Sequence, residues 1–234
     1  MTITSDRRAE SGWWYALAAF AVFTLLGMDL LSLFVGRLLD GPAAQHVGVW
    51  PSRWYATIGQ FAFSIMLWTA AAVLAVYLAR RLCVLGALFG GRWDGRVVAV
   101  LCLGVLAVAA IQLIETAGVP SLSLLREYRG FERRYLGHAA IVTTFQYVYY
   151  LLESVMVVLM LATWQRAGEL WTRRAWVPWG GLGLMLTWGL VHFLSHPAGA
   201  LTVVLSALVF GGVFVGARKS AAATLVVVYL AFVL

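Results

Sequence analysis

The sequence predicts an all-α membrane protein, a polytopic transmembrane helical bundle of six to seven spans with a cytoplasmic N-terminus. Three observations carry this prediction. Of the 234 residues 62% are hydrophobic, only 12% are charged, and the mean hydropathy is +0.87. Soluble domains carry about 25% charged residues, so the lipid bilayer is the expected solvent. Residues 1–234 are expected to form a single integral membrane domain.

The candidate spans are apolar runs of about 20 residues, the length that a helix needs to cross about 30 Å of hydrocarbon. Six are clear and a seventh is short: 13–34, 54–78, 97–117, 138–162, 177–196, 198–217 and 221–234. The first run is too long for the apolar core of a signal peptide and contains Asp29, so we expect a retained anchor. The last run fits a short or tilted span, or an interfacial segment.

The distribution of basic residues predicts the orientation. With the N-terminus inside, cytoplasmic segments hold 11 Lys and Arg residues against six outside, which agrees with the positive-inside rule. The net charge of +7 is therefore assigned to cytoplasmic loops rather than to nucleic-acid binding. We expect a multi-pass protein of a bacterial plasma membrane, with the lipid bilayer as its partner and no nucleic acid.

The segment 120–137 carries four of the six outside arginines together with Glu127 and Glu132. Its pattern is typical of an amphipathic piece on the membrane surface, which we prefer to a binding site for an acidic partner. In the sixth span, Gly212 and Gly216 form a small-x-x-x-small pair, which predicts close approach of a neighbouring helix.

Polar residues inside the spans are functional candidates, because an ionisable group in the bilayer is costly unless it is paired or hydrated. At about 1.5 Å rise per residue, Glu153 lies roughly 15 Å and His192 roughly 22 Å from the cytoplasmic end of their spans, close enough for contact. Asp29, Glu115 and His196 come out at about 24 to 28 Å and would form a separate outer layer.

Helical spacing indicates two polar faces that look at each other. One holds Gln146, Tyr149, Tyr150 and Glu153, and the other holds Trp188, His192 and His196. A Glu–His pair in a water-poor cavity suits general-base activation of water, because either group can take the proton while its partner orients it. The same pair could instead fix helix packing by a hydrogen bond, or bind a proton or a metal.

The segment Tyr150-Leu151-Leu152-Glu153 and the aromatic-x-x-x-His segment Trp188-Gly189-Leu190-Val191-His192, followed by the glycine-rich run at 210–214, resemble motifs of a known family. The resemblance is to the CAAX-protease and bacteriocin-processing (CPBP) family of polytopic intramembrane proteases. It implies that Glu153 activates water for hydrolysis of a peptide or lipidated peptide, and that His192 helps to stabilise the oxyanion. We expect no cofactor and no metal, with His196, Gln146, Tyr150, Trp188, Asp29 and Glu115 as the supporting polar site.

The chain departs from that family pattern at three places. Leu152 stands where a second Glu belongs, no Arg follows at Val157 or Val158, and the third motif is missing from 225–234. Either Gln165, Glu169 or His196 takes over a role, or catalysis has been lost. The alternatives are a non-catalytic immunity, scaffold or transporter-accessory module, and a haem or metal protein using the i, i+4 pair His192 and His196.

Overall fold

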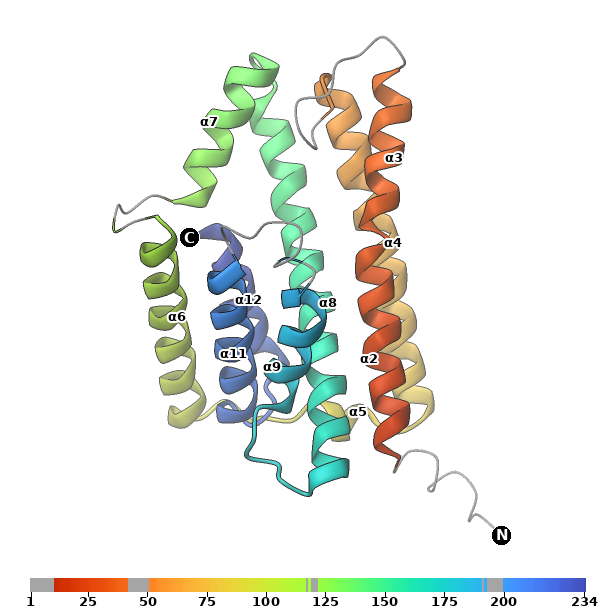
Figure 1. The fold of residues 1–234 in the computed structure, drawn as a ribbon, viewed down its shortest axis with the longest axis vertical. Coiled ribbons are helices and arrows are strands. Elements are labelled where there is room, and N and C mark those ends of the chain that lie inside the picture. The colour runs from red at the N-terminus through yellow and green to blue at the C-terminus, as the bar shows by residue number, and fades with distance from the viewer. Residues whose placement is uncertain (1–10, 42–50, 117, 119–121, 191, 193–199) are drawn as a thin grey trace.

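The computed structural model describes residues 11–41, 51–116, 118, 122–190, 192 and 200–234. Every regular element in these ranges is a helix, and the helices form a bundle (Figure 1). In chain order they are α2 (Gly12–Gly27), α3 (Asp29–Asp40), α4 (Trp54–Arg81), α5 (Leu85–Leu88), α6 (Gly95–Glu115), α7 (Ser123–Tyr135), α8 (Ala139–Thr172), α9 (Trp179–Leu184), the π-helix η1 (Met185–Gly189), α11 (Ala200–Gly216) and α12 (Ala221–Val233). The all-α bundle predicted from composition is confirmed.

Four helical segments among the described residues are long and apolar enough to cross a membrane: the joined α2 and α3, then α4, α6 and α8. The apolar helices α11 and α12 are shorter. The spans predicted from hydropathy differ most from the helices at 138–162, because α8 continues to Thr172. Of the predicted fifth span, 177–190 and His192 are described, and the rest lies outside the described residues.

Helix α8 lies at the centre of the bundle and organises the packing. On one side it contacts α2 and α4, and on the other side α9 and α12, while α11 and α12 pack in turn on α6 (Figure 1). The main core gathers buried side chains from these helices, among them Trp68, Met156, Phe210 and Val227. This core separates a polar region near α7 from a second one at the opposite end of α8. We call them the outer and the inner region, after the orientation that the sequence predicts.

The polar last turns of α8 continue the helix because the residues beyond Ala162 find partners inside the protein. Thr163, Gln165 and Glu169 are buried, and Arg173 ends the helix in the left-handed conformation with φ 58°. Apolar length alone could not predict this extension, because a hydropathy scale scores these side chains as polar whether or not they are buried.

Glycines allow a close helix contact between α9 and α11. A Cβ built on Gly211 would lie 2.5 Å from Cα of Gly181, so only glycine fits there. Nothing lies within 4 Å of a Cβ built on Gly212, while one on Gly216 would meet Val100 of α6 at 3.1 Å. The predicted contact of Gly212 and Gly216 is therefore wrong at Gly212, and the close approach belongs to its neighbour.

Candidate functional site

Asp29 lies at a break in the first membrane-crossing segment, where α2 ends and α3 begins. Its Oδ1 accepts hydrogen bonds from Ser32 at 2.9 Å and from Ser64 of α4, and its Oδ2 accepts one from the Tyr149 hydroxyl at 3.0 Å. The indole of Trp68 donates to the carbonyl of Leu25 at 3.2 Å. Three helices thus meet at the half-buried Asp29 carboxylate, and hydrogen-bond donors from all three satisfy its oxygens.

Glu153 lies beside this cluster on α8 and is 8% exposed. The carboxyl groups of Asp29 and Glu153 lie close enough to interact, and the Trp188 indole lies beside the Glu153 carboxyl. The expectation that Asp29 and Glu153 occupy separate layers is therefore wrong. The depth estimate took Ala162 as the cytoplasmic end of this span. Helix α8 continues about ten residues further, to Thr172, so Glu153 lies about 15 Å farther from that end than expected.

His192 follows the π-helix η1, a rare widening of the helical turn that is frequent at functional sites. Its Nδ1 lies 3.0 Å from the carbonyl oxygen of Trp188, and the two rings lie 4.4 Å apart between centroids. Because a carbonyl can only accept, Nδ1 carries the proton of the neutral ring, and Nε2 holds the lone pair. Trp188 thus contacts both residues of the predicted pair.

A cavity of about 460 Å³ opens in the outer part of the bundle, between α6, α7, α8, α11 and α12. The polar residues that line it are Gln112, Glu115, Ser123, Arg126, Glu127, Tyr150, Trp188, His192, Thr202 and Ser206. Glu153 is not among the lining residues, since it lies against Trp188. The structure therefore brings Glu115, Tyr150, Trp188 and His192 together, and it places Asp29 and Glu153 in the neighbouring cluster.

Gln146 connects to the cavity through Tyr150. Its Nε2 donates to the Tyr150 hydroxyl at 2.8 Å, and this hydroxyl donates to Oε1 of Glu127 at 2.9 Å. The four polar residues predicted to share one face of α8 are therefore divided between two sites, because Tyr149 binds Asp29 while Gln146 and Tyr150 point to α7. His196 lies outside the described residues.

Glu127 is the residue that the sequence analysis missed, because its segment was interpreted as an amphipathic piece on the membrane surface. Burial raises the pKa of the Glu127 carboxyl above its ordinary value, although the Tyr150 hydrogen bond acts in the opposite direction. A signal was available in the spacing. Ser123, Glu127, Phe131 and Tyr135 recur every four residues, and the first, third and fourth of them are buried. Glu127 therefore belongs to the inner face of α7.

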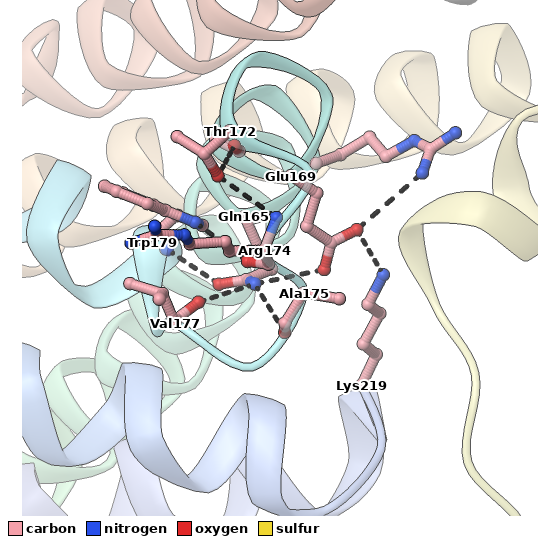
Figure 2. A network of polar contacts seen from close by, with 11 residues as sticks. Gln165, Glu169, Thr172, Arg174, Ala175, Val177, Trp179 and Lys219 are labelled. Carbon is pink, nitrogen blue, oxygen red and sulfur yellow. Dashed lines mark hydrogen bonds and ion pairs between the residues drawn. The ribbon is translucent and has the colours of Figure 1, made fainter.

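Gln165 and Glu169 are part of a separate network at the inner end of α8 (Figure 2). The Gln165 amide donates to Oε1 of Glu169 at 3.0 Å and to the carbonyl of Val177 at 2.9 Å, and its oxygen accepts from the Gly180 amide. Lys219 donates to Oε2 of Glu169 at 2.7 Å. These contacts hold the connection between α8 and α9. Gln165 and Glu169 are not among the residues that line the cavity with His192, so neither supplies a group to it.

Among the described residues, no three His, Cys, Asp or Glu side chains gather in a way that could hold a metal ion. The haem or metal hypothesis depends on His196, which is not described, so it stays a hypothesis.

Comparison with known proteins does not place the chain in a family. No protein-family model, curated protein or solved structure matches it at a significant level. The resemblance to CPBP proteases therefore stays a prediction, as does the catalytic assignment of Glu153 and His192.

Proposed function

We propose that this chain is an intramembrane hydrolase of the divergent CPBP-like kind, which cleaves a peptide or lipidated peptide in the outer cavity. The observation that carries the proposal is the position of Trp188, whose indole lies beside the Glu153 carboxyl and whose ring packs on His192 at the cavity. A buried acid and a cavity-lining imidazole joined through one side chain suit acid–base chemistry.

In the proposed reaction His192 is the group that moves the proton. Its Nδ1–H is held by the Trp188 carbonyl, so Nε2 accepts a proton from water as the water oxygen attacks the peptide carbonyl. The protonated ring then gives this proton to the leaving amine, which yields a carboxylic acid and an amine. Glu153 acts as a positioning residue through the indole of Trp188, which lies beside its carboxyl.

The test is cleavage of a lipidated, fluorogenic peptide library in proteoliposomes. We expect His192→Ala to abolish turnover, and Glu153→Gln to lower it at least tenfold and to shift its pH profile. His138→Ala is the matched control, because His138 stacks on Trp54 at the outer end of α4. Unchanged turnover in both site variants would overturn the proposal.

The second candidate is a non-catalytic membrane module, such as an immunity, scaffold or transporter-accessory protein. The observation that favours it is that Glu153 lies outside the cavity lining and beside the Asp29 cluster that joins α3, α4 and α8. In this case Glu153→Gln changes the stability of the protein in detergent and abolishes no reaction. A stoichiometric partner that co-purifies with the wild type would support this candidate.

The location that belongs to the leading proposal is a bacterial plasma membrane with the N-terminus inside. The apolar helices make the chain compatible with a membrane, and the excess of basic residues in alternate connections favours this orientation. The cavity, beneath α7, would then open toward the outer face.

A further inference from the structure

We infer that the outer cavity binds a primary ammonium group carried on an apolar chain, with Glu127 and Gln112 as its hydrogen-bond acceptors. As a statement about the substrate, namely that the peptide presents a Lys side chain or a free amino terminus here, the inference rests on the proposed hydrolysis. As a statement about binding, it stands on the cavity alone.

Two acceptor atoms at the cavity are buried and have no hydrogen-bond partner among the described residues, Oε1 of Gln112 and Oε2 of Glu127. The other ends of both side chains are held. Nε2 of Gln112 donates to the carbonyl of Ala231 at 2.8 Å, and Oε1 of Glu127 accepts from Tyr150. Because the Ala231 carbonyl can only accept a hydrogen bond, the NH₂ group of Gln112 must face it. The Gln112 oxygen is therefore the unpaired end of the amide.

Tyr147 also lies near the Glu127 carboxyl. Its hydroxyl is buried and makes no hydrogen bond of acceptable geometry with a described residue. The Tyr147 hydroxyl and Oε2 of Glu127 therefore lie near each other, and each is without a partner of acceptable geometry. Buried polar atoms are normally paired, so unpaired acceptors that line one cavity indicate a donor that binds there.

The charges at the cavity favour a cationic donor. Glu115 and Glu127 contribute two carboxylates, and Arg126 is the cation on the same lining. The Arg126 guanidinium donates to the Ser123 hydroxyl at 3.0 Å. The Arg126 charge acts on Glu127 at a distance, but no ion pair within the described part of the chain joins it to either carboxylate. An ammonium group would add a second positive charge and the missing donors.

The remaining walls define the rest of the ligand. Ile111, Val203, Phe210 and Phe232 face the same cavity. A volume of about 460 Å³ lies within the usual range of small-ligand sites, which combine apolar walls with a few polar groups. An ammonium with a short alkyl chain satisfies both parts of this lining.

The experiment measures binding of hexylamine to the wild-type protein in nanodiscs by isothermal titration calorimetry, with empty nanodiscs subtracted. Hexanol and hexanoate are the matched probes, since they keep the chain and change the head group. We expect saturable binding of hexylamine and at least tenfold weaker binding of the other two. Equal binding of hexylamine and hexanol, preference for hexanoate, or no saturable binding, in which case water alone fills the cavity, would each overturn the inference.

Variants connect the binding to the two acceptors. Glu127→Gln and Gln112→Leu should each weaken hexylamine binding at least fivefold, and Glu115→Gln provides a cavity variant at an exposed position. The control is Glu132→Gln, because Glu132 is exposed on α7 and lies outside this cavity. Unchanged affinity in all three cavity variants contradicts the inference. His192→Ala should still bind hexylamine, which separates failure of binding from failure of the proposed hydrolysis.

Discussion

The hydroxyl of Tyr149 on α8 donates a hydrogen bond of 3.0 Å to the carboxylate of Asp29, which lies 120 residues earlier in the chain at the break between α2 and α3. This contact connects the N-terminal helix pair to the central helix. The acceptor is a half-buried carboxylate, and hydrogen bonds to charged groups are the stronger class.

Tyr149→Phe should therefore destabilise the protein by roughly 1.5–3 kcal/mol, because the half-buried Asp29 carboxylate keeps one donor fewer and hydrogen bonds to carboxylates lie in this range. The measurement is the unfolding transition in mixed detergent, followed by circular dichroism. Tyr77→Phe is the control, since Tyr77 is exposed and contacts only Arg81 in the described polar contacts. Equal stability of the two variants would show that the Asp29 contact contributes nothing.

Adjacent glycines on α11 provide a second prediction. Gly211→Ala should cost about 1–3 kcal/mol, because its Cβ would lie 2.5 Å from Cα of Gly181, and backbone cannot move as a side chain does. Gly212→Ala meets open space and should leave the stability unchanged or raise it by up to about 1 kcal/mol through helix propensity. Thermal unfolding of both variants in the same detergent tests the order, and a larger loss in Gly212→Ala would contradict the packing.

The inner network predicts a defined effect at Lys219. Lys219→Met removes the closest cation from Glu169, whose side chain is 6% exposed, and leaves Arg166 at 3.7 Å. We expect a loss of about 1–3 kcal/mol in unfolding free energy, since one partner of a buried charge is removed. Arg80→Met removes the same charge from an exposed position and serves as the control. The double variant Lys219→Met, Glu169→Gln should recover part of the loss, because no unpaired charge remains.

The pH dependence of stability should differ in sign between Glu127 and Asp94, neither of which lies in a spanning segment. The pKa of Glu127 is raised, mainly by burial, so the folded state holds this proton more tightly than the unfolded state. The contribution of Glu127 to stability is therefore lost as the pH rises from about 4.5 through the raised pKa. Glu127→Gln should flatten the melting temperature in that range, measured at constant ionic strength from about pH 4 to about pH 7.

Asp94 provides the opposite sign. Its pKa is lowered, first by the hydrogen bond from the Val97 amide, which begins α6, and also by the charge of Arg218. Its contribution is present above its ordinary pKa of 3.8 and is lost as the pH falls through the lowered value. Asp94→Asn keeps the cap and removes the charge, so its melting temperature should fall less than the wild type's below about pH 4. The same sign in both variants would contradict these two assignments.

The sequence predicted the helical bundle because membrane helices are recognised by apolar length, and α4 and α6 begin and end close to the expected positions. It failed where polar side chains are buried by neighbours. The extension of α8 past Ala162 depends on Gln165 finding the connection at 173–178, and this partner is a tertiary contact that no local pattern contains.

The candidate site was predictable in part for the same reason. Helical spacing brought Trp188 and His192 to one face, and the structure confirms that they lie together. The grouping of Asp29 with Glu153 was missed because a depth estimate depends on where each helix ends. Glu127 was missed because its helix was interpreted by its exposed arginines, although the four-residue spacing from Ser123 to Tyr135 already separated its inner face.

The proposed orientation can be tested with the chain's own cysteines. Cys83 is exposed in the connection after α4, a segment that the count of basic residues places in the cytoplasm, and Cys102 lies within α6. In intact cells a membrane-impermeant maleimide should not label Cys83, whereas inverted vesicles should be labelled at that position, with Cys102→Ser as the background. Cys83→Ser is the control for specificity. Because a thiol in water reacts and one in hydrocarbon is shielded from a charged reagent, labelling of Cys83 from outside would reverse the topology and direct the cavity inward.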